Sequence, residues 1–154
     1  SDTPITVRNK TATRPWQHVL EPLSGYLWLG AQLVSSPDAC FQSAFNFGPD
    51  LTSNRTVAEL VAELITHTGG QWIDASDPNA LHEASKLNLS TDKAFHLLKW
   101  QPVWSFEQTI ETTAAWYLGE NSGQSAADLT QSQIIAYQTN ATRKSLPWAL
   151  SQNQ

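Results

Sequence analysis

Basic charge, cysteine and methionine are all scarce in this chain. Lys and Arg together number nine against fourteen Asp and Glu, and they form no run. Because nucleic acids and anionic membranes bind clustered basic residues, neither is expected as a partner. A single cysteine, Cys40, excludes an internal disulfide and favours a reducing, cytoplasmic compartment. Methionine is absent and the first residues run directly into a strand pattern, so the sequence predicts a fragment of a longer protein.

The sequence also lacks long apolar runs and the motifs of several kinds of site. No run approaches the ~18 apolar residues that a membrane span needs. No Gly-x-Gly-x-x-Gly follows a strand pattern, so no turn is predicted that could hold a dinucleotide pyrophosphate. No Tyr-x-x-x-Lys pair occurs, and no Cys/His cluster has zinc spacing. We therefore expect this chain alone to bind no cofactor or metal and to carry no catalytic residue.

The residues that are present predict one α/β lobe. With 154 residues, 40% of them hydrophobic and seven of them Trp, the chain can build one core. Periodicity predicts short strands at residues 5–7, 44–49 and 71–73, an edge strand at 83–89, and helices at 19–33, 57–68, 91–99, 106–117 and 128–137. These strands are too short for an independent doubly wound sheet. The lobe is therefore expected to pack against a partner domain.

Local signals predict how several of these helices begin. Thr56 and Glu59 have the spacing of a capping box, and Ser90 and Ser105 are expected to cap the helices that follow them. The two tryptophans of residues 100–104 predict a structural clasp between helices. The tail after residue 140 is mostly polar and is expected to fray or dock loosely.

The segment from Arg14 to His18 holds the strongest candidates for a binding site. Arg14 is expected in a loop between a strand and a helix, where a guanidinium can direct two donors at a phosphate or carboxylate. Free N–H groups at the helix start would favour the same anion. Trp16 could wall the pocket or stack on a ligand. The residues alone leave anion binding and a structural ion pair as two open readings for Arg14.

The histidines allow a catalytic reading as well as a structural one. His18 with Glu21, or His82 with Glu83, could act as an acid/base pair. A histidine at a helix start more often caps or packs, and we prefer that reading for His18. A hydrolase that uses His18 and Glu21 is kept as a minor alternative.

Blocks in consistent order from about residue 4 to about residue 137 match one enzyme family. The block Arg14-Pro-Trp-Gln-His-Val-Leu-Glu-Pro-Leu23 is the most particular, and Asn46-Phe-Gly-Pro49 and Leu98-Lys-Trp-Gln-Pro102 are more widely shared. On these blocks the chain resembles the CDP-glucose 4,6-dehydratases, a branch of the extended short-chain dehydrogenase/reductases. The resemblance implies that the chain is the C-terminal substrate lobe of a Rossmann-type enzyme, with a nucleotide-sugar-binding lobe at residues 1–140 and a tail at 141–154.

The resemblance also implies a function for the whole enzyme. With tightly held NAD, such an enzyme would convert CDP-glucose to CDP-4-keto-6-deoxyglucose, a precursor in polysaccharide biosynthesis. NAD and the catalytic residues would belong to a missing N-terminal Rossmann half, and the enzyme could form a homodimer. Arg14 matches the family's arginine that contacts the substrate diphosphate. Trp16 and His18 lie in the same block, so we expect them to bind substrate too.

The chain departs from related epimerases at a second phosphate-binding arginine. His82 stands near that position and could replace it as a weaker, pH-dependent donor. A different class of function also stays open, in which the chain is a stand-alone domain that binds a small molecule or a protein.

Overall fold

The strands that the structure describes form two small sheets of two strands each, and all four lie in the first half of the chain. The computed structural model describes residues 3–77 and 87–150. Strand β1 (Ile5–Val7) pairs in parallel with β4 (Trp72–Asp74), and β2 (Thr13–Pro15) pairs antiparallel with β3 (Asn54–Thr56). Three-residue strands bury little surface by themselves, so the helices supply most of the packing.

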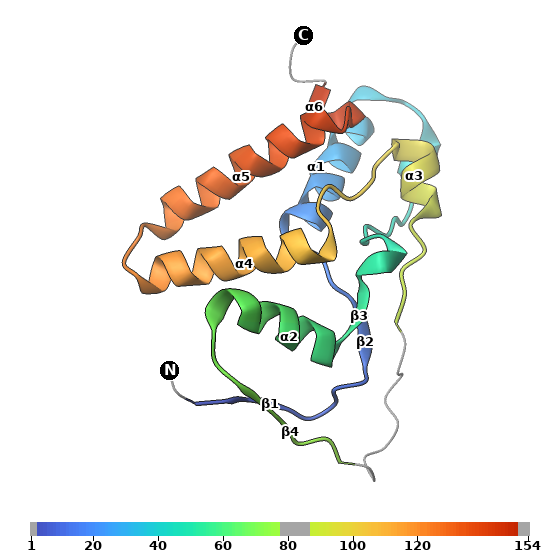
Figure 1. Ribbon diagram of the computed structural model, residues 1–154. Coiled ribbons are helices and arrows are strands. Elements are labelled where there is room, and N and C mark those ends of the chain that lie inside the picture. The colour runs from blue at the N-terminus through green and yellow to red at the C-terminus, as the bar shows by residue number, and fades with distance from the viewer. Residues whose placement is uncertain (1–2, 78–86, 151–154) are drawn as a thin grey trace.

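Six α-helices and two short 3₁₀ turns account for most of the described residues (Figure 1). The helices are α1 (Leu20–Ser35), α2 (Val57–Thr68), α3 (Asp92–Leu98), α4 (Phe106–Asn121), α5 (Ala126–Arg143) and α6 (Pro147–Leu150). The turns are η1 (Ala39–Phe41) and η2 (Leu51–Ser53). The expected mixed α/β lobe is thus confirmed. The structure describes one helix more than the four to five that the sequence predicted, the short α6.

The capping box predicted at Thr56 and the cap predicted at Ser105 both start helices in the structure. Thr56 accepts a hydrogen bond from the backbone N–H of Glu59, whose carboxylate in turn accepts one from the backbone N–H of Thr56. Ser105 and Gln108 make the same reciprocal pair at α4. Helix α2 ends at Gly69, whose φ of 67° lies in the region that glycine adopts without strain.

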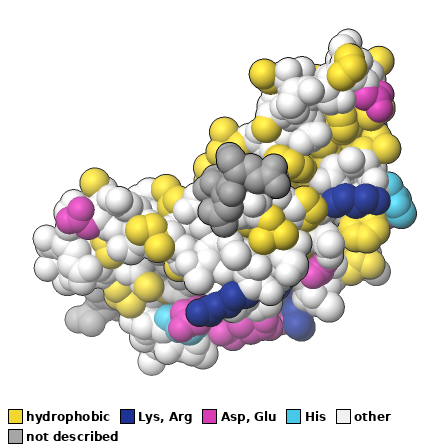
Figure 2. Space-filling view, turned by 90° about the horizontal axis from the view of Figure 1, so that it is seen from above, with side chains coloured by type: hydrophobic (Ala, Val, Ile, Leu, Met, Phe, Trp, Pro, Cys, Tyr) yellow, Lys and Arg dark blue, Asp and Glu magenta, His cyan; other side chains and the backbone are white. Residues whose placement is uncertain are grey.

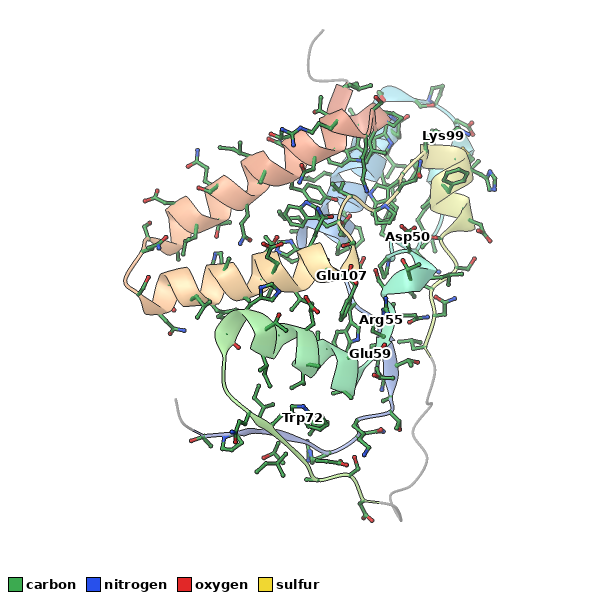
Figure 3. All side chains as sticks on the ribbon, in the orientation of Figure 1. Asp50, Arg55, Glu59, Trp72, Lys99 and Glu107 are labelled. Carbon is green, nitrogen blue, oxygen red and sulfur yellow. The ribbon has the colours of Figure 1, made fainter. Side chains whose placement is uncertain are left out.

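Helices α4 and α5 form an antiparallel hairpin, and α2 packs along the other side of α4 (Figure 1). Arg55 joins β3, α2 and α4 at one point. Its guanidinium lies 3.3 Å from Glu59 and 3.9 Å from Glu107, and it stands over the ring of Phe106 (Figure 3). These exposed ion pairs add little stability singly, but they fix how the three elements meet.

The core consists of two clusters built largely on aromatic rings. The first contains Val103, Trp104, Tyr137, Ala141 and Leu146, and the second contains Phe47, Ala94, Leu98 and Trp100. Trp148 packs against both clusters, and its ring stacks on that of Tyr137 at 5.6 Å. The expected clasp is confirmed, because Trp100 and Trp104 are buried in different clusters at the two ends of one connector.

Several sequence-based expectations were wrong. Residues 44–49 form no strand, because no described strand pairs with them. Thr91 occupies the N-cap position of α3 in place of Ser90. Helix α5 begins earlier and ends later than predicted, so it crosses residue 140, and Leu146 beyond it is buried rather than frayed. Most of the edge strand predicted at 83–89 lies outside the described residues. None of the described helices is long and apolar enough to cross a membrane.

Candidate functional site

Arg14 lies at the centre of strand β2 and not in a loop. Its Cα pairs with that of Arg55 on β3, so both side chains leave the same face of the ladder. Arg14 is half-buried, and its Nη1 donates to the carbonyl oxygen of Thr13 at 2.8 Å. Arg55 is held by Glu59 and Glu107. The ladder therefore places two guanidinium groups on one face.

The start of α1 does not offer the free N–H groups that the sequence analysis expected near Arg14. The N–H of Leu20 donates to Nδ1 of His18 at 3.3 Å, and the N–H of Glu21 donates to the His18 carbonyl oxygen at 3.0 Å. The next residue is a proline, and the N–H of Leu23 reaches the carbonyl oxygen of Val19. Each donor of the first turn thus has an acceptor. Binding of an anion at Arg14 would therefore depend on the guanidinium group and not on N–H groups of helix α1.

Trp16 holds the second sheet together. Its indole Nε1 donates to the carbonyl oxygen of Arg55 at 2.9 Å, and its backbone N–H reaches the carbonyl oxygen of Ser53. The backbone N–H therefore continues the β2–β3 ladder beyond its last strand pair, and the indole adds a side-chain bond to the middle of β3. Trp16 does not line the cavity that contains His18.

His18 is buried where α1, α4 and α5 meet. Its Nδ1 accepts from Leu20, and its ring makes an edge contact with Trp104 at 4.8 Å between centroids. The Gln133 side chain bonds the imidazole, and its amide nitrogen donates to the Thr112 carbonyl oxygen at 2.7 Å. The Gln133 oxygen is therefore left to accept from Nε2–H. This chain of bonds fits a neutral ring, and burial lowers the pKa of His18.

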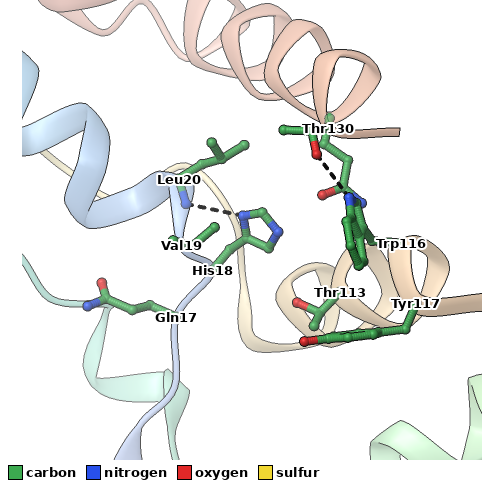
Figure 4. A pocket seen from close by; sticks show the side chains of 9 residues that line it. Gln17, His18, Val19, Leu20, Thr113, Trp116, Tyr117 and Thr130 are labelled. Carbon is green, nitrogen blue, oxygen red and sulfur yellow. Dashed lines mark hydrogen bonds between the residues drawn. The ribbon is translucent and has the colours of Figure 1, made fainter. Parts of the chain in front are cut away.

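His18 also lines an open cavity of about 450 Å³ (Figure 4). Trp116 and Tyr117 of α4 face it from the side opposite His18, and Trp116 is fixed by a bond from its Nε1 to Thr130 at 3.0 Å. The lining residues are Gln17, His18, Val19, Leu20, Thr113, Trp116, Tyr117, Thr130 and Gln133. The structure therefore brings His18, but neither Arg14 nor Trp16, to this cavity. His82, the fourth residue predicted to bind substrate, lies outside the described residues.

The neutral state of His18 gives a testable pH dependence. A histidine whose pKa is lowered by folding stabilises the native state above its unfolded pKa near 6.5, and this contribution is lost as the pH falls. His18→Asn keeps an acceptor for the Leu20 N–H but does not titrate. From about pH 8 to about pH 5.5, we expect urea unfolding to show wild type losing stability relative to this variant, by at most about 1.4 kcal/mol per pH unit.

His96 provides the control, since it is exposed on α3. The variant His96→Asn should keep the same pH dependence as wild type. Parallel stability curves for wild type and His18→Asn would show that His18 is not held neutral by its surroundings.

Glu21 is a buried carboxylate whose role the sequence analysis missed. Its side chain is 1% exposed. Its oxygens accept from the backbone N–H groups of Val103 (3.0 and 3.1 Å) and Trp104 (2.8 Å), and from the hydroxyl of Tyr137 (2.7 Å). Burial raises the pKa of Glu21, while the Trp104, Val103 and Tyr137 donors and the Lys144 charge lower it.

The hydroxyl of Ser24 extends this network into the second cluster. It lies 3.0 Å from the Tyr137 hydroxyl and accepts from Nε1 of Trp100 at 2.9 Å. The network therefore ties α1 to the 100–104 connector and to α5. The only sequence signal was a glutamate in the first turn of a helix, which is common at helix starts.

A hydrolase that uses His18 and Glu21 loses its geometric basis. The carboxylate is occupied by its three donors and closed to solvent. The imidazole bonds Leu20 and Gln133, and the two side chains share no hydrogen bond. Within residues 3–77 and 87–150, no group of three His, Cys, Asp or Glu side chains could hold a metal ion.

Comparison with known proteins gives one match across most of the chain. It is 34% identical over 141 residues to the CDP-glucose 4,6-dehydratase of Salmonella typhimurium, which covers 90% of this chain and 39% of that enzyme. The chain thus spans about two-fifths of the length of the relative. No model of a known protein family matches it. Over most of its length the chain is thus similar to a CDP-glucose 4,6-dehydratase, and its mixed α/β lobe of six described helices and short strands is consistent with the C-terminal lobe of such an enzyme.

Proposed function

We propose that this chain is the nucleotide-sugar-binding part of a CDP-glucose 4,6-dehydratase, with Arg14 as the residue that holds the substrate diphosphate. The 34% identity to such an enzyme carries the proposal. Arg14 supports it because β2 fixes the backbone of this residue, while the guanidinium can direct paired donors at a diphosphate. The complete enzyme would convert CDP-glucose to CDP-4-keto-6-deoxyglucose.

The ladder supplies a physical reason for an anion at this face. Arg14 and Arg55 lie directly opposite each other in the ladder, so two guanidinium groups leave the same face of the sheet. A diphosphate bound at this face would carry the opposite charge to both groups. Under this proposal Trp16 acts indirectly, because its bond to the Arg55 carbonyl oxygen keeps the two strands paired.

The residues of this chain do not fit NAD, the cofactor of the proposed enzyme. A dinucleotide site needs a glycine-rich turn between a strand and a helix. In the part of the chain that the structure describes, Gly25 and Gly30 lie inside α1, Gly119 lies inside α4, and Gly69 and Gly70 precede a strand. We therefore assign NAD and the catalytic residues to the remainder of the enzyme.

Titration with CDP-glucose tests the role of Arg14. In the complete enzyme, Arg14→Ala should weaken binding at least about tenfold, because a charge-assisted bidentate contact is lost. Arg14→Lys should recover part of the lost affinity, since lysine keeps the positive charge but cannot direct two parallel donors at the diphosphate. Calorimetric titration measures both.

Arg8 supplies the matched control, because it is exposed beyond the end of β1. Arg8→Ala should bind CDP-glucose as wild type does. Equal affinity of Arg14→Ala and wild type would refute the diphosphate role. Tight binding of CDP-glucose by a monomer of the 154 residues alone would instead favour the stand-alone binding domain.

A further inference from the structure

The cavity beside His18 carries no formal charge on its walls. Among the described residues that line it there is no Lys, Arg, Asp or Glu. Burial lowers the pKa of His18, so the imidazole is neutral at pH 7 as well. An ion that entered this space would lose water without meeting an opposite charge. The cavity therefore favours an uncharged occupant.

The surroundings do not supply a strong field of one sign either. Figure 2 shows one side of the molecule, where charged side chains are few and where acidic and basic ones lie near one another along one edge. The whole chain has a formal net charge of only −5. A cleft attracts ions when its own walls carry charge of one sign, and the described walls of this cavity carry none.

Aromatic rings form two sides of the cavity (Figure 4). His18 lies on one side, and Trp116 and Tyr117 lie on the other. The rings of Trp116 and Tyr117 meet edge to face at 5.2 Å between centroids, and the His18 ring is fixed by its edge contact with Trp104. Aromatic rings attract other flat rings in stacked or edge-to-face geometry. These walls therefore suit a flat ring better than a saturated chain.

Most polar groups on the α4 and α5 walls already have partners. The Trp116 indole N–H donates to Thr130 at 3.0 Å, and the Thr113 hydroxyl and the Gln133 amide donate to backbone carbonyl oxygens at 2.7 Å. Within the described part of the chain, the hydroxyl of Tyr117 makes no hydrogen bond, and this residue is 60% exposed. It is the group on the aromatic wall that is available to bond an occupant.

We propose that this cavity is a second binding site, which takes an uncharged, flat compound of one or two rings, such as an indole or a phenol, against the rings of His18, Trp116 and Tyr117. Its volume of about 450 Å³ lies within the usual range of small-molecule sites. The site is separate from the proposed diphosphate contact, because Arg14 does not line it. The inference goes beyond the proposed function and does not depend on it.

Titration of the complete protein with indole tests the site. In ¹H–¹⁵N NMR spectra the side-chain N–H of Trp116 should shift in a saturable way, with a Kd of about 1 mM or lower. The signal is assigned by its loss in Trp116→Phe. The side-chain N–H of Trp72 on β4, which does not line the cavity (Figure 3), should not shift. Equal shifts of the two signals would show non-specific contact and overturn the inference.

Two matched compounds test the chemistry of the occupant. Indole-3-carboxylate keeps the rings and adds a charge, and cyclohexanol lacks the flat ring. Each should bind at least about tenfold more weakly than indole, because the walls offer no cation and attract flat rings. Equal affinity for indole and either compound would contradict the proposed selectivity.

Tyr117→Ala tests the aromatic wall with little risk to folding, since this residue is exposed. The variant should bind indole about three- to tenfold more weakly, because one ring contact is lost. Tyr117→Phe keeps the ring and should retain most of the affinity. The matched control is Leu118→Ala, at the next and also exposed position of α4, which does not line the cavity and should bind as wild type does. Unchanged affinity in Tyr117→Ala would overturn the inference.

Competition separates this site from the substrate site. Saturating CDP-glucose should leave the indole affinity unchanged. Displacement of indole would place the cavity in the substrate site and overturn the inference of a second one. Absence of a saturable shift at Trp116 would show that the cavity is closed in the complete protein and would also overturn it. Failure of the diphosphate role of Arg14 would change none of these results.

Discussion

Replacing Glu21 by Ala is expected to cost about 3–5 kcal/mol of unfolding free energy, the cost of removing one partner from a buried charged network. The change leaves the backbone donors of Val103 and Trp104 and the hydroxyl of Tyr137 facing a void. It also opens a cavity at a residue that is 1% exposed. Urea unfolding of the 154-residue chain, followed by far-UV circular dichroism, measures the loss.

The variant Glu21→Gln separates hydrogen bonding from charge. The Gln oxygen can still accept from Val103 and Trp104, and its amide can donate to the Tyr137 hydroxyl. That hydroxyl can then donate to Ser24, which lies 3.0 Å away. We expect a cost of about 1–2 kcal/mol. If Glu21→Ala and Glu21→Gln were equally mild, the carboxylate would not be what holds α1 to the connector.

Replacing Gly25 by Ala should be the second most damaging change. A Cβ at this position would lie 2.3–2.6 Å from three carbons of the Phe47 ring. The ring cannot retreat easily, because it packs edge-on against Trp100 at 5.1 Å and against Tyr26 at 5.5 Å. We expect a loss of about 2–3 kcal/mol from overpacking, measured by the same unfolding experiment.

Gly30 offers a matched control on the same helix. No atom lies within 4 Å of a Cβ built there. Gly30→Ala should therefore stabilise the chain by about 0.5–1 kcal/mol, through helix propensity alone. If Gly25→Ala were also stabilising, this result would contradict the close packing of the Phe47 ring against Gly25.

Local signals could be read from the sequence, and tertiary ones could not. The box at Thr56 and the cap at Ser105 were predicted correctly because each involves partners only three residues apart. The strand predicted at 44–49 failed for the opposite reason, since a strand exists only where another pairs with it. Helix α5 was predicted too short because its last turns are stabilised by burial of Ala141 in the first cluster, which no local pattern records.

In the candidate site, too, local features could be predicted from the sequence, whereas contacts between distant residues could not. The block from Arg14 to Leu23 carried the resemblance that the comparison supports, and His18 packs against Trp104 and accepts from the Leu20 N–H, in line with the preferred structural reading. Glu21 was read as a candidate acid or base because its donors at Val103 and Trp104 lie more than 80 positions away. The binding roles of Arg14, Trp16, His18 and His82 stay predictions.

The Glu21 network also bears on the order of events during synthesis. The carboxylate of residue 21 cannot form its hydrogen bonds until the donors at residues 103 and 104 and the hydroxyl of residue 137 have been synthesised. On a ribosome, α1 would leave the exit tunnel long before any of them, with its anchoring carboxylate unpaired and its apolar side open. Contacts of such large sequence separation form slowly because the intervening loop must close first. Helix α1 is thus the segment that would depend most on a chaperone until α5 has emerged.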